Sequence, residues 1–198
     1  SAVPMSGNAL QRMRVHAINQ SLFAPCALQE GIRRLGFVQA DPIRAPARAQ
    51  DLILRHRVHN YRAGDLERQY PELDIEEDYL YAYGFLPRDI WRLLHPRVVR
   101  KMSAMEKKVL KVVRTYGRMH PRELETHLGR ERVINAWGGY SKATTHALEI
   151  LHYRGLLRIA RRENGIRVYE PVPATSADEH IAPEERLRRL IHLLASLL

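Results

Sequence analysis

The pair Asn164-Gly165 is the feature of this sequence that most restricts its fold. Asn-Gly between two short apolar segments indicates a tight β-hairpin, because both residues tolerate the positive φ angles that such turns need. Here the flanking segments are 156–160 and 166–169, and the basic stretch 161–165 joins them. We therefore predict a two-stranded hairpin with arginines at its tip.

Three helical patterns precede this hairpin. Residues 105–116 carry apolar side chains at helical spacing and are followed by Gly117, while Pro121 is suited to the first turn of a second helix that ends near Gly129. Ser141 is expected to cap a third helix with a stripe of apolar positions along one side. Three helices and a hairpin predict a winged helix, so the expected fold class is mainly α with short β-hairpins.

The charge of the chain is concentrated in the same stretch. Lysine and arginine total 32 against 22 acidic residues, a formal charge of +10, and residues 97–167 hold 17 of these cations and only six acids. Such a balance attracts phosphate-rich partners, and we expect duplex DNA. The single cysteine, Cys26, excludes an internal disulfide and a multi-cysteine zinc site, and is consistent with a reducing compartment. For a protein that binds DNA we therefore expect a cytoplasmic, nucleoid-associated location. No apolar run is long enough to cross a membrane, so we expect no membrane span. We also expect no cofactor and no metal.

Two surfaces of the second half are predicted to contact DNA. The polar face of the third helix could lie in a major groove, and the hairpin arginines could reach phosphates. The candidate residues are Ser141, Lys142, Thr145, His146, Arg161, Arg162 and Arg167. The alternative is that this winged helix serves protein contacts and that its third helix presents a merely solvated polar face.

The first half carries an amide and a carboxylate two residues apart, Gln39 and Asp41, in the short extended run 37–42. Alternate residues of a strand point to the same side, so the two side chains are expected to share one surface. A carboxylate can accept a proton from water or stabilise a cationic sugar, and an amide can hold that water. Arg44 and Arg48, which lie along a predicted helix over 45–58, could contact the DNA backbone. In the alternative interpretation, Asp41 organises a turn and Gln39 satisfies a backbone group.

Several segments together resemble a known family. The runs 35–43, 47–52, 84–87 and 138–157 are similar to the tandem winged-helix DNA glycosylases of the YcaQ/AlkZ type. The resemblance implies consecutive winged-helix units and monofunctional excision of alkylated or crosslinked purines by cleavage of the N-glycosidic bond. Gln39 and Asp41 fall on the catalytic pair, where Gln-x-Asp is typical of the crosslink-repair branch. Asp41 would assist the attacking water or stabilise the oxocarbenium ion, and Gln39 would position that water.

The same resemblance gives the expected domain organisation. We expect a first winged-helix-like domain over 1–100 with the Gln-x-Asp motif, a basic second winged-helix domain over 101–172, and a linker with the first helix of an incomplete third domain over 173–198. We therefore expect a fragment, which could bind DNA yet lack a closed active site. The alternative function is that of a non-catalytic winged-helix DNA-binding protein or transcriptional regulator. No protein partner is predicted.

Overall fold

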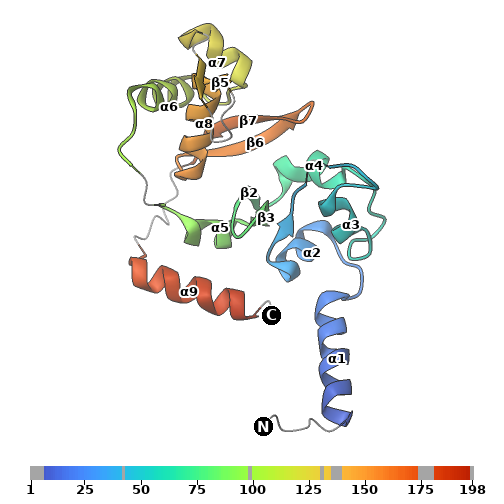
Figure 1. The fold of residues 1–198 in the computed structure, drawn as a ribbon. Coiled ribbons are helices and arrows are strands. Elements are labelled where there is room, and N and C mark those ends of the chain that lie inside the picture. Colours follow the sequence, from blue (N-terminus) through green and yellow to red (C-terminus); the bar gives the residue numbers. More distant parts are fainter. Residues whose placement is uncertain are drawn as a thin grey trace.

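The computed structural model describes residues 7–41, 43–97, 100–129, 132–134, 140–173 and 181–196. In these ranges the chain is mainly helical with small antiparallel sheets, which confirms the predicted fold class at this coarse level (Figure 1). The elements of the first half are α1 (Gly7–Ser21), α2 (Leu28–Leu35), β1 (Val38–Gln39), α3 (Ala49–Arg55), α4 (Asp65–Gln69), the 3-10 helix η1 (Tyr70–Glu72), β2 (Ile75–Tyr79), β3 (Tyr83–Pro87) and α5 (Arg88–Leu94). The remaining elements are α6 (Ala104–Tyr116), α7 (Pro121–Leu128), β4 (Arg132–Ile134), β5 (Tyr140–Lys142), α8 (Ala143–Tyr153), β6 (Leu157–Glu163), β7 (Ile166–Pro171) and α9 (Pro183–Ser196). No helix in the described ranges is long and apolar enough to cross a membrane.

The first half is built on a three-stranded antiparallel sheet in the order β1-β3-β2. Gly84 of β3 lies opposite Gln39 of β1. A Cβ atom at Gly84 would come within 2.4 Å of both the Val38 carbonyl oxygen and the Phe37 ring. A glycine at this position therefore allows β1 and the ring beside it to approach β3 closely.

The helix predicted over 45–58 is shorter than expected, because α3 covers only Ala49–Arg55. Pro46 lacks a backbone N–H and disfavours helical geometry in the residue before it. The backbone is still extended at Arg48, whose φ is −65° and ψ 147°. Arg48 consequently stands at the amino end of the helix rather than along its side.

The helices and the hairpin predicted in the second half are present. Ser103 and Glu106 form a capping box at the start of α6, Pro121 begins α7, and β6 pairs with β7. The hairpin turn has positive φ angles at Asn164 (49°) and Gly165 (81°), as the sequence predicted. Strand β6 continues to Glu163, so the connection is tighter than the predicted loop.

The predicted cap of the third helix is wrong. The N-cap of α8 is Lys142, and no side-chain hydrogen bond caps this helix. Ser141 lies in β5, which pairs with β4 in a small additional sheet, and because the helix begins only at Ala143, Ser141 is one residue too far from it to be the N-cap. The predicted loop around Gly138-Gly139 lies outside the described residues.

One continuous apolar core joins the two halves. Buried side chains of β3 and η1, such as Phe85 and Tyr70, belong to the same cluster as Leu148 and Leu151 of α8 and Ile159 of β6. A smaller cluster lies on the other side of the first sheet and brings together Phe37, Leu86, Ile90 and Trp91. Helix α9 reaches this second cluster beside α5 through Leu193 (Figure 1).

Candidate active site

Gln39 and Asp41 project from the edge of the first sheet, and Val38 and Ala40 pack on the other side. Val38 is fully buried and Ala40 packs against the main core, whereas Gln39 is exposed and Asp41 is half-buried. The Ala40 N–H donates to the Tyr83 carbonyl oxygen at 2.9 Å, so the strand-like pairing continues between the two polar residues. The expected alternation is therefore observed.

The two oxygens of the Asp41 carboxylate have different surroundings. Oδ1 accepts a hydrogen bond from the Ile43 N–H at 2.8 Å, which is the turn-forming role of the alternative interpretation. Oδ2 accepts no hydrogen bond from the described residues. One oxygen thus orients the carboxylate, and the other is available to a water molecule or a sugar.

The main chain at Asp41 is held from behind by α3. The buried side chain of Gln50 accepts a hydrogen bond from the Asp41 N–H through Oε1, at 3.1 Å. Its neighbour Asp51 accepts hydrogen bonds from the Tyr61 hydroxyl and the Gly64 N–H, both at 2.9 Å. Burial, and then the hydrogen bond to Asp51, raise the pKa of Tyr61. The sequence did not identify Gln50 as a support, because nothing in its spacing shows that it faces β1.

The two arginines predicted beside the pair differ in their contacts. Arg44 is exposed in the segment that follows Asp41. Arg48 forms an ion pair with Glu67 of α4, and only 16% of its side chain is exposed. Arg48 therefore links the start of α3 to α4, while Arg44 is the one that extends into solvent.

The predicted contact residues of α8 are partly engaged within the protein. Lys142 pairs with the buried Glu125 of α7, and Thr145 and His146 are half-buried. The side chain of Ser141 lies outside what the structure describes. His152, near the end of α8, is buried, and its Nε2–H donates to the Glu77 carbonyl oxygen at 2.8 Å. Its burial lowers the pKa of the imidazole.

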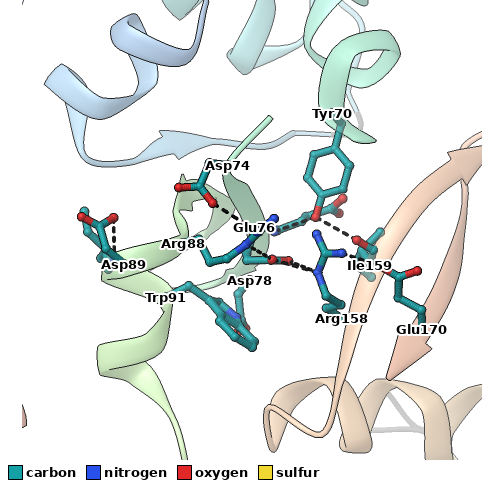
Figure 2. A network of polar contacts seen from close by, with 12 residues as sticks. Tyr70, Asp74, Glu76, Asp78, Arg88, Asp89, Trp91, Arg158, Ile159 and Glu170 are labelled. Carbon is teal, nitrogen blue, oxygen red and sulfur yellow. Dashed lines mark hydrogen bonds and ion pairs between the residues drawn. The ribbon is translucent and has the colours of Figure 1, made fainter. Parts of the chain in front are cut away.

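The hairpin arginines meet carboxylates of β2. Glu76, Glu77 and Asp78 are consecutive and each is about 1% exposed. Arg158 donates to Glu76 at 2.8 Å, as Figure 2 shows, and Arg162 forms a two-point contact with Glu77. These ion pairs connect the hairpin to the first sheet across more than 80 residues of sequence.

Further arginine contacts surround the same carboxylates. Arg167 lies 3.4 Å from Glu77 and stacks over the Tyr83 ring at 4.4 Å. Burial acts to raise the pKa of Glu77, but Arg162 and Arg167 outweigh it and hold that pKa below its usual value. Of the three hairpin arginines predicted to contact DNA, only Arg161 has an exposed partner, Glu163. The contacts of Arg162 and Arg167 are missed by sequence reasoning because their partner lies in another part of the chain.

Asp78 is enclosed by a different set of donors. Its carboxylate accepts hydrogen bonds from Trp91 Nε1 at 2.8 Å and Arg97 at 2.9 Å, and His95 Nε2 lies 2.8 Å away. Burial favours the neutral carboxyl group, but the contacts with His95 and Arg97 outweigh that effect and lower the pKa. The sheet therefore has three consecutive buried carboxylates along one edge strand and the exposed Gln39 on the other.

The described part of the chain thus combines a mainly helical fold, a concentration of positive charge and an exposed amide beside an oriented carboxylate. A family model described as "DNA glycosylase AlkZ-like" matches residues 32–197. The chain belongs to the AlkZ-like DNA glycosylase family, which confirms the resemblance seen in the sequence and makes DNA its expected substrate. No curated protein and no solved structure gives a significant match. The matched range includes every candidate site residue named above.

Proposed function

We propose that this protein is a monofunctional DNA glycosylase that removes alkylated purines, including those in interstrand crosslinks, from duplex DNA. The observation that carries the proposal is Asp41, whose carboxylate is oriented through Oδ1 by Ile43 while Oδ2 is left without a partner among the described residues. Family membership supports glycosylase chemistry in general. The Gln-x-Asp pattern supports the crosslink-repair branch.

The reaction is a hydrolysis at C1′ of the deoxyribose. The bond between C1′ and the purine N9 breaks, and its electron pair leaves with the base. Alkylation at N7 gives the purine a formal positive charge, so the base departs neutral without a protein acid. The sugar then has oxocarbenium character, which the negative charge of Asp41 stabilises. Water adds to C1′ and passes a proton to Asp41 or to solvent, while the Gln39 amide orients that water.

The proposed enzyme holds DNA with winged-helix units. The order α6, α7, α8, β6, β7, with the short strands β4 and β5 between α7 and α8, supports this, because a winged helix has three helices followed by a hairpin. We extend the proposal to consecutive units, with a first over 1–100, a second over 101–172 and the start of a third in α9. Gln39 and Asp41 belong to the first of these and the concentration of positive charge to the second.

The test is base excision by the purified chain on duplexes carrying N7-methylguanine or a nitrogen-mustard crosslink. We expect alkali-labile abasic sites with the wild type, and an excision rate at least about a hundredfold lower with Asp41→Asn, because the amide lacks the negative charge that the transition state requires. Asp89→Asn is the matched control, since Asp89 is exposed and, like Asp41, accepts a backbone hydrogen bond through Oδ1, here from Ile90 at 3.0 Å.

Two results would contradict this proposal. Tight binding of the damaged duplex by the wild type without any base release would leave the non-catalytic DNA-binding protein as the function of this chain. Equal excision by the wild type and Asp41→Asn would show that the chemistry does not depend on the proposed carboxylate. Excision by wild type and Asp89→Asn alone is the supporting outcome.

A further inference from the structure

The hairpin β6–β7 carries little net charge once its ion pairs are considered. Its four arginines contact four carboxylates, two from the hairpin itself and two from β2. These pairs are Arg158 with Glu76 and Glu170, Arg161 with Glu163, and Arg162 and Arg167 with Glu77. The excess positive charge of the second half must therefore be presented by another element.

Helix α6 presents a group of unpaired cations. Lys107, Lys108, Lys111 and Arg114 are all exposed, and none forms an ion pair within the described ranges. The only acid of this helix, Glu106, is buried and is already paired with Arg100 and Arg154. We call these four cations the α6 basic face. It keeps its full positive charge, unlike the hairpin.

Helical geometry places the four cations on one side of α6. At about 100° per residue they cover roughly a third of the circumference, opposite the core-facing positions Val109 and Val113. Lys107 and Arg114 are seven positions apart, about 10 Å along the axis. Consecutive base pairs rise about 3.4 Å along one DNA strand, so this length corresponds to about three nucleotides.

A shallow hollow lies beside these cations. It is lined by Met102, Lys107, Leu110, Lys111, Arg114 and Thr115. Its apolar floor can support the methylene parts of the lysine side chains, while their charged ends stay at the surface. Such a surface suits a phosphate chain better than base edges, because lysine contacts are adjustable point charges without a fixed hydrogen-bond pattern.

We propose that the α6 basic face is a binding site for the phosphate backbone of duplex DNA, used independently of sequence and of damage. Figure 1 places α6 and α3 on opposite sides of the molecule. A duplex held by α6 therefore has a contact away from Gln39 and Asp41. This inference deepens the proposed function and rests on it for the identity of the ligand.

The test is fluorescence anisotropy of an undamaged duplex over a series of salt concentrations. We expect the triple variant Lys107→Ala/Lys111→Ala/Arg114→Ala to lose about ten- to a hundredfold in affinity at 0.1 M salt. The slope of log K against log salt should become shallower by about 2 to 3, because each phosphate contact contributes about 0.9. The matched control, Arg12→Ala/Arg14→Ala/Arg92→Ala, removes the same charge from exposed positions without ion pairs in the described ranges.

The conservative variant Lys107→Arg/Lys111→Arg tests the role of charge separately from folding, and it should keep wild-type affinity. Equal affinity and slope for the α6 triple variant and the control triple variant would overturn this inference. The assay uses undamaged DNA, so its outcome is separate from that of the excision test. Binding that depends on α6 without excision would contradict only the proposed chemistry, and excision with unaltered binding would contradict only the α6 site.

Discussion

The hairpin β6–β7 and helix α6 are both rich in cations, but they use them differently. Arg162 and Arg167 of the hairpin neutralise Glu77, a residue buried in another part of the chain. Lys107 and Lys111 of α6 face solvent and have no carboxylate beside them in the described ranges. A cluster of positive charge in a sequence therefore indicates a DNA-binding surface only where the cations are not already paired with buried carboxylates.

Removing the buried carboxylate of Glu77 should have the largest effect of the changes proposed here, because it unpairs the hairpin arginines and leaves the α6 cations unchanged. We expect Glu77→Gln to lower the free energy of unfolding by about 3 to 5 kcal/mol, because it leaves two partly buried guanidinium groups without their counter-charge. Urea denaturation at pH 7 measures the change. Glu163→Gln is the control, since it removes an exposed carboxylate from Arg161 and should cost less than about 1 kcal/mol. Equal losses in the two variants would show that burial does not distinguish the pairs.

Acid should weaken the ion pairs between the hairpin arginines and the buried carboxylates of β2, whereas the α6 cations have no such pairs within the described residues. The pKa of Glu77 and that of Asp78 are both held below their ordinary values, so the stability these groups contribute is fully present above about pH 5. That stability is lost as the pH falls below about 4 towards the folded-state pKa values, where protonation removes the ion pairs.

The measurement is urea denaturation at pH 7, 5 and 3.5. The free energy of unfolding should fall with decreasing pH more steeply in the wild type than in Glu77→Gln. The Glu163→Gln variant should follow the wild type. A wild-type curve that coincides with that of Glu77→Gln would mean that the buried pair does not control acid stability.

Arg161 should give the smallest effect, because its hairpin position is exposed and its only described partner is exposed as well. We expect Arg161→Ala to make the salt slope of duplex binding shallower by about 1 at most, with little change in thermal midpoint. Parallel anisotropy titrations with Arg161→Ala and Lys111→Ala make the comparison direct. A much larger loss of duplex affinity for Arg161→Ala than for Lys111→Ala would show that the hairpin, and not α6, provides the main DNA contact.

Local sequence signals predicted the elements whose stability is local. The turn at Asn164-Gly165 and the helix α6 follow from backbone preference and apolar spacing. The shared surface of Gln39 and Asp41 follows from strand alternation. The shorter α3 reflects Pro46, and the extended backbone at Ser141 reflects its pairing in β5.

The interactions that were not predicted join distant segments. Glu76, Glu77 and Asp78 are three consecutive acids for which the sequence indicated no role, and they are buried because arginines from other elements surround them. In the same way, the support that Gln50 gives to Asp41 depends on how α3 packs against β1. Contacts of this kind can be identified only from the tertiary fold. Spacing within a segment shows which side chains share a face, but not which distant residues they contact.

The register of the first sheet has a mechanical consequence. Asp78 of β2, Gly84 of β3 and Gln39 of β1 are directly opposite one another, and Glu77, Phe85 and Val38 form the adjacent row. Arg162 holds Glu77 of β2, so two strands, β2 and β3, lie between the hairpin and the strand that carries Gln39. A displacement of Glu77 by the hairpin would therefore reach the strand that carries Gln39 only through the β2–β3 and β3–β1 backbone pairings.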